Sequence, residues 1–138
     1  MEIQKEEGPK MEIEKIARQN FARWAEALLA KDAKKAAELY VEGNTFLPTM
    51  SPEFKRGKTE AKDYFEHFLE VNPKGEIKEE EVQVLGEKAY IHSGMYNFEV
   101  DQDGKRSVIE ARFTFVWEKD ASGKWKIVHH HSSQKPKA

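Results

Sequence analysis

The sequence predicts an α+β fold in which three N-terminal helices pack on a curved antiparallel sheet, with the element order ααβαββββ. Apolar residues recur at helical spacing in the first half of the chain, most clearly over residues 61–69. After Gly75 the pattern changes to four strand-like segments. Short turns containing Gly86, Gly104 and Gly123 separate these segments. Because short turns join antiparallel neighbours, the last four strands form a meander.

Composition limits the class of protein. The 138 residues make one domain that is long enough to bury a core. A net charge of -2, with acids and bases interspersed, argues against binding to nucleic acid or an anionic membrane. The absence of cysteine excludes disulfides and zinc sites built on cysteine. No signal peptide or apolar run of about 20 residues is present, so we expect a soluble, cytoplasmic protein.

The domain is expected to span residues 11–133. Residues 1–10 are acidic, and Met11-Glu12-Ile13 repeats the first three residues, so the start is predicted to be a flexible extension. Residues 134–138 are predicted to form a flexible tail. No internal repeat or linker divides the chain.

The helices are predicted from apolar spacing and from their end signals. The first covers residues 12–30, and Asp32 is placed to cap a second over residues 33–40, which Gly43 and Asn44 would end. A short strand over residues 45–47 and a proline-containing loop over residues 48–56 follow. Gly57 opens the third helix, which stops at Asn72 and Pro73.

The sheet is predicted to centre on its last two strands. The four strands cover residues 77–85, 89–100, 105–118 and 124–133. In the third, one alternating set is apolar and is the natural core face: Ala111, Phe113, Phe115 and Trp117. The opposite face of the sheet keeps apolar residues too, among them Ile91, Met95 and Val100, which predicts a homodimer or larger ring formed through the sheet.

Several motifs carry a resemblance to a known family. They are Gly57 followed by Tyr64-Phe65-Glu66, and Gly123-Lys124-Trp125 followed by Val128, His129 and His131. With the element order, residues 11–133 resemble the NTF2-like superfamily. Within it they look most like the association (hub) domain of calcium/calmodulin-dependent kinase II and its bacterial SgcJ/EcaC or SnoaL-like relatives.

The resemblance implies a cone-shaped NTF2-like fold with a small-molecule pocket, and self-assembly through the sheet. It also implies a departure from the kinase hubs, which place arginines in the pocket. At those positions this chain has Met95, Phe115 and Ser132. Arg112 is the arginine that remains in the interior of the strands. The implied partners are further copies of the chain and a small organic or carboxylate ligand.

Three consecutive histidines invite a functional interpretation. His129 and His131 face one side of their strand and His130 the other. A catalytic zinc needs a third protein ligand, which His92 could supply only if the fold brought it near. We therefore expect no metal and no cofactor. One or two of the histidines are expected to line the pocket mouth or the subunit interface.

The candidate ligand-pocket residues are Tyr64, Tyr96, Arg112, His129 and His131. Buried tyrosine hydroxyls need partners, and a guanidinium can bind a carboxylate or form an ion pair with Glu110 at an interface. No set of residues supplies a clear general base, so catalytic residues stay unassigned. The main hypothesis is a non-catalytic association domain. The alternative is a SnoaL-like or isomerase-type enzyme for an apolar carbonyl substrate, with His129 or His131 as the base and Arg112 as its electrostatic partner.

Overall fold

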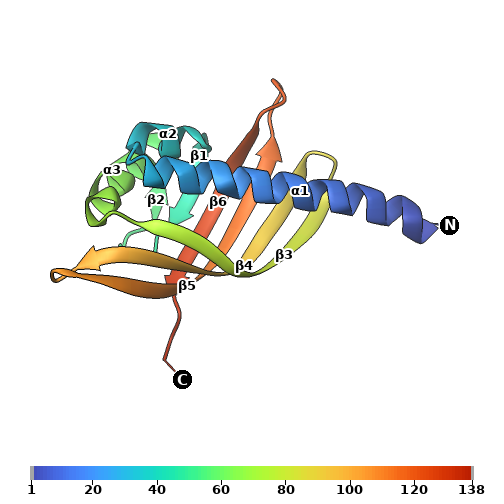
Figure 1. The fold of residues 1–138 in the computed structure, drawn as a ribbon. Helices are drawn as coiled ribbons and strands as arrows, with labels where there is room; N and C mark the ends of the chain where they lie inside the picture. The colour runs from blue at the N-terminus through green and yellow to red at the C-terminus, as the bar shows by residue number, and fades with distance from the viewer. Residues whose placement is uncertain (1, 138) are drawn as a thin grey trace.

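A computed structural model describes residues 2–137 (Figure 1). Helix α1 (Glu2–Leu29) lies across one face of a six-stranded sheet. It begins well before residue 12, so residues 2–10, predicted to be a flexible extension, continue the helix instead. Glu, Lys and Gln in this segment are good helix formers, and the helix continues through Gly8 and Pro9, which are poor ones. Residues 8–10 are exposed, and this end of the helix projects past the sheet in Figure 1.

Helix α2 (Ala33–Glu38) confirms the predicted N-cap, because an Asp32 carboxylate oxygen accepts a hydrogen bond from the Lys35 backbone N–H at 3.0 Å. The prediction that Gly43 and Asn44 end this helix is wrong. Strand β1 (Tyr40–Leu47) starts directly after the helix and contains both residues. The chain turns into the sheet this early because Tyr40 is fully buried and pairs with Ile127 of the last strand.

The third helix, α3 (Gly57–Phe68), begins and ends close to its predicted bounds, and the 3-10 turn η1 (Leu69–Val71) follows it. Gly57 has φ +84°, which favours glycine. Asn72 ends the turn in the left-handed conformation before Pro73. A two-residue strand, β2 (Lys55–Arg56), precedes the helix and pairs with β1, and the sequence did not predict it.

Four long strands form the predicted meander: β3 (Lys74–Gly86), β4 (Ala89–Gln102), β5 (Lys105–Lys119) and β6 (Trp125–Gln134). The sheet order is β2-β1-β6-β5-β4-β3, which confirms β5 and β6 as its centre. The pairing of β1 with β6 is parallel and was not predicted. None of the helices in residues 2–137 is long and apolar enough to cross a membrane.

The inner face of the sheet, which meets the helices, carries the core. Ala111, Phe113, Phe115 and Trp117 are buried there, as predicted. The rings of Trp24 and Phe115 lie 5.4 Å apart, which ties α1 to the middle strand. Val100, expected on the opposite face, is also fully buried with this inner set. The fold is therefore a layer of helices on one face of a curved sheet (Figure 1).

Candidate functional site

A buried imidazole lies at the centre of the inner face. His130 is only 1 % exposed, and its ring lies between two phenylalanine rings. The centroid of Phe115 is 3.9 Å away and that of Phe46 is 4.8 Å away, both in stacked geometry. The Nδ1 atom of His130 lies 2.8 Å from the Tyr40 hydroxyl, and Nε2 lies 3.2 Å from the Tyr96 hydroxyl. Both ring nitrogens therefore have partners inside the core.

The hydrogen bonds around this histidine form one directed chain. Trp24 Nε1 donates to the Tyr40 hydroxyl at 3.1 Å, so the Tyr40 proton is free to point at Nδ1 of His130. The neutral ring then carries its proton on Nε2 and donates it to Tyr96. The Tyr96 hydroxyl in turn donates to Ser132 Oγ at 2.5 Å. The Ser132 hydroxyl meets Thr49 Oγ1 on the loop after β1, where the chain of bonds ends.

Burial keeps every member of this network uncharged. It lowers the pKa of His130 well below the ordinary value, and the charges that His129 and His131 can carry lower it further. Burial also raises the pKa of the Tyr40 and Tyr96 hydroxyls, although the hydrogen bond that Tyr40 accepts from Trp24 and the one that Tyr96 donates to Ser132 oppose that shift. A neutral imidazole and two neutral phenols are the expected species at pH 7.

The space beside this network is small. A cavity of about 10 Å³ lies between Tyr64, Tyr96, His130 and their neighbours. That volume is about what one water molecule needs. The aromatic side chains therefore fill the space between the helices and the sheet, with Phe115 stacked on His130 and Ser132 bonded to Tyr96.

A larger opening, which we name the α3 cleft, lies between α3 and the loop joining β1 and β2. Its volume is about 370 Å³ and its walls are mainly apolar, with Met50, Tyr64, Phe68 and Val71 among them. Tyr64 and Phe68 also border the small inner cavity, so these two side chains separate the two spaces.

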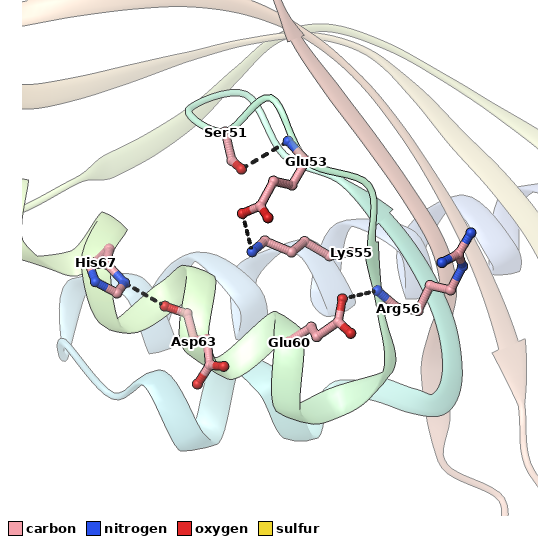
Figure 2. Close-up of polar contacts among 7 residues, drawn as sticks. All are labelled: Ser51, Glu53, Lys55, Arg56, Glu60, Asp63 and His67. Carbon is pink, nitrogen blue, oxygen red and sulfur yellow. Dashed lines mark hydrogen bonds and ion pairs between the residues drawn. The ribbon is translucent and has the colours of Figure 1, made fainter.

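Polar groups cross the mouth of the α3 cleft. Figure 2 shows the Glu53 carboxylate meeting the Lys55 ammonium between the loop and α3, at 2.9 Å. Ser51 Oγ accepts a hydrogen bond from the Glu53 backbone N–H at 3.1 Å, which fixes the loop. On the helix, His67 Nδ1 lies 2.9 Å from the backbone oxygen of Asp63. The cleft thus combines an apolar wall with a charged rim, as small-molecule sites usually do.

The structure divides the five predicted pocket residues between two faces of the sheet. Tyr64 and Tyr96 lie on the inner side and border the same small cavity. Arg112 is exposed on the outer side, where it donates to Ser133 Oγ at 3.3 Å. His129 Nδ1 lies 2.7 Å from Thr45 Oγ1, and His131 is exposed on the same side. The geometry therefore does not bring Arg112 or either histidine together with the tyrosines.

His130 is absent from the candidate residues predicted from the sequence, although the strand pattern contains a signal for it. Strand alternation already set His130 opposite to its two neighbours. The register pairs it with Phe115, which belongs to the predicted core face. Strand alternation therefore predicts that His130 and Ser132, two positions apart, both point to the inner face.

His92 is a second buried histidine, further along the inner face. Its Nε2 atom lies 2.9 Å from the Glu80 carboxylate, while its Nδ1 atom has no partner among the described residues. Burial lowers the pKa of His92, and Glu80 opposes that shift. Among residues 2–137, no group of three potential metal ligands comes together.

Comparisons with known proteins support one family. A family model described as the calcium/calmodulin dependent protein kinase II association domain matches residues 10–136. A solved structure from Xanthomonas campestris, assigned to the same association domain, is 38 % identical. The similarity covers 90 % of this chain and 88 % of that one, with a TM-score of 0.84. No curated protein matches the chain at a significant level.

More distant structures share the fold alone. An NTF2-like protein with a cystatin-like fold from Novosphingobium aromaticivorans is 13 % identical and has a TM-score of 0.76, covering 93 % of this chain and 85 % of that one. A protein from Streptomyces avermitilis, assigned as a dehydratase of the NTF2-like family, is 15 % identical with a TM-score of 0.78, covering 94 % and 99 %. The predicted NTF2-like fold is confirmed.

Proposed function

The chain belongs to the calcium/calmodulin dependent protein kinase II association domain family, and on that premise we propose that it assembles with copies of itself through the outer face of its sheet. The outer face is the side of β4, β5 and β6 that points away from the helices. The observation that carries the proposal is that all three helices lie on the opposite side (Figure 1).

The register shows what the outer face contains. One row across the strands joins Ile91, Val116 and His129, and a second joins Ser93, Thr114 and His131. A third row joins Met95, Arg112 and Ser133. Apolar side chains thus lie on both sides of a central row of hydrogen-bonding groups, and the Arg112 guanidinium lies in the last row. Protein interfaces commonly combine apolar contacts with hydrogen-bonding side chains in this way.

This proposal gives three of the predicted pocket residues a different role. Arg112, His129 and His131 would contact a partner subunit and not a ligand. Their placement lends no support to the enzyme alternative, in which these side chains act beside Tyr64 and Tyr96. We therefore assign no reaction to the protein.

A small-molecule site remains part of the proposal and is placed at the α3 cleft. Tyr64 supplies an aromatic wall that reaches the cleft, and the Lys55 ammonium is the nearest cation for a ligand carboxylate. Tyr96 lies behind Tyr64, so a ligand would reach it only after that ring turned. Nuclear magnetic resonance of the chain with a fragment mixture tests this part. Shifts at His67 and Tyr64 support it, and shifts confined to the outer face contradict it.

Self-association is tested by size-exclusion chromatography with light scattering. The unaltered chain should elute as a dimer or larger assembly at micromolar concentration. Val116→Glu places a charge in the centre of the outer face and should shift the protein towards monomer. Leu29→Glu is the matched control, because Leu29 is an exposed apolar residue on the helical side.

Two results would overturn the proposal. A monomer at micromolar concentration would contradict self-association itself. An assembly that survives Val116→Glu but is lost with Leu29→Glu would place the contact on the helices and not on the outer face. Circular dichroism of each variant shows that a change in size does not come from unfolding.

A further inference from the structure

A second groove, separate from the α3 cleft and the outer face, opens between α1, α2 and the start of β6. We name it the Trp125 groove. Its volume is about 600 Å³, within the range of small-molecule sites. Four basic side chains line it, from α1, from α2 and from the turn and first residues of β6: Arg23, Lys35, Lys124 and Lys126.

These four cations have no carboxylate within ion-pair distance among the described residues. Two of them are held by neutral groups instead. Arg23 Nη1 donates to Asn20 Oδ1 at 3.0 Å, and Lys126 Nζ donates to the backbone oxygen of Glu38 at 2.7 Å. A guanidinium has five N–H donors and an ammonium has three, so both side chains keep donors for a ligand.

The groove is locally positive although the whole chain is slightly negative. Its lining holds four bases against two acids, Glu26 and Glu38, while the chain carries a net charge of -2. Lys126 is half-buried, and burial lowers its pKa. The positive charges of Lys58, Lys124 and Arg23 lower it further. A bound anion would relieve this repulsion between like charges, and an excess of two positive charges favours a dianion over a single carboxylate.

One wall of the groove is aromatic. Trp125 is half-buried and packs against Tyr90, with ring centroids 5.2 Å apart, while Leu39 lies beside it. The other two tryptophans are buried, with 1 % exposure for Trp24 and none for Trp117. A planar ring in the groove could therefore pack on Trp125 while its anionic part met the bases.

We propose that the Trp125 groove binds a phosphorylated small molecule with a planar ring, of the nucleotide class. Its phosphates contact Arg23 and Lys126, and its ring packs on Trp125. Phosphate suits this site because its charge exceeds that of one carboxylate and because arginine can donate two parallel hydrogen bonds to it. The site is independent of self-association through the outer face.

The test is a titration of the full chain with ADP at low salt, read by tryptophan fluorescence. ADP should quench the emission of Trp125 with a saturable curve that weakens as salt is added. Inorganic pyrophosphate should compete, and adenosine alone should not. Arg23→Gln with Lys126→Gln should weaken ADP binding at least tenfold. Lys35→Gln with Lys124→Gln, at two exposed positions, should act in the same direction.

The matched control is Lys78→Gln with Arg106→Gln, which removes the same charge from side chains paired with Glu76 and Asp101 outside the groove. Equal weakening in the control and in Arg23→Gln with Lys126→Gln would overturn the proposal, because the effect would then come from net charge alone. Absence of saturable ADP binding would also overturn it. Trp125→Leu removes the fluorescent reporter, so its affinity and that of the unaltered chain are compared by titration calorimetry. The variant should bind ADP only as tightly as pyrophosphate, and an unchanged affinity would refute the ring contact.

Light scattering in the same buffers separates this proposal from the proposed function. The assembly formed through the outer face should keep its size when ADP is added. If ADP changed the size of the assembly and Trp125 emission changed only together with that size, a neighbouring copy and not a small molecule would occupy the groove, and the proposal would be wrong. Loss of assembly in Val116→Glu leaves the ADP result unaffected.

Discussion

The imidazole of His130 is stacked on the ring of Phe115 with 3.9 Å between the ring centroids, in the centre of the sheet's inner face. The contact joins the two strands that the sequence marks as the middle of the sheet. It places a neutral polar ring, which is 1 % exposed, in the middle of the core. The aromatic packing on both sides explains why the cavity beside it holds about 10 Å³.

Tyr40→Phe tests the hydrogen-bond chain. The Tyr40 hydroxyl accepts from Trp24 and contacts His130, so its removal leaves a buried N–H and a buried ring nitrogen without partners. Each such group costs about 1–3 kcal/mol. Urea unfolding should therefore show that the free energy of unfolding falls by about 1–3 kcal/mol or more. Tyr64→Phe should cost less, because Tyr64 borders the open α3 cleft, where water can replace its hydroxyl. Equal losses of stability in Tyr40→Phe and Tyr64→Phe would contradict the hydrogen-bond chain assigned around His130.

Stability should fall as the pH decreases below about 6.5. The folded chain holds the pKa of His130, His92 and His129 below the ordinary value, mainly through burial. Between the folded and unfolded pKa values the unfolded chain binds more protons, so acid favours unfolding. Each such group contributes a slope of up to about 1.4 kcal/mol per pH unit. Urea unfolding at several pH values between about 5.5 and 7.5, on either side of the ordinary histidine pKa, measures how the free energy of unfolding depends on pH.

His130→Gln is the matched variant for the pH experiment. Glutamine keeps a donor and an acceptor but does not titrate in this range. The variant should show a shallower dependence of the unfolding free energy on pH, whatever its absolute stability. An unchanged slope would show that His130 is not the group that resists protonation.

Gly94→Ala should distort the contact between β3 and β4. A Cβ atom at this position would lie 1.9 Å from the backbone oxygen of Glu79. The strands would have to separate, at a cost of roughly 1–3 kcal/mol or more. Gly86→Ala is the control, because a Cβ atom there has no atom within 4 Å. The thermal unfolding midpoint of Gly94→Ala should be well below that of Gly86→Ala. Equal midpoints would refute the close approach between residue 94 and the backbone of Glu79.

Asp32→Ala should weaken the second helix. Its carboxylate caps the backbone N–H of Lys35, and loss of such a cap costs about 0.5–2 kcal/mol. Asp32→Asn keeps a side-chain oxygen and should keep most of the stability. Urea unfolding of both variants checks the result. A loss in Asp32→Asn as large as that in Asp32→Ala would show that charge, and not the hydrogen bond, is responsible.

Local patterns predicted most of the elements, and tertiary contacts explain the differences. The spacing of Tyr64, Phe65 and Phe68 was sufficient for α3, since one helical face must meet the core. The end of α2 was misplaced because Gly43 and Asn44 look like a helix stop. In the structure they lie in an irregular part of β1, which pairs with β6 some 85 residues later. A local window contains no information about that parallel pairing.

By itself, the sequence determined the α+β class, the meander and the core face of β5, because turn residues and strand alternation are local properties. The tertiary structure decided which histidine is buried, how little space the cone encloses, and where the bases of the Trp125 groove meet. The physical reason is distance along the chain. Arg23, Lys35 and Lys126 look interspersed with acids in the sequence, and only the packing of α1 and α2 beside β6 gathers them around one groove.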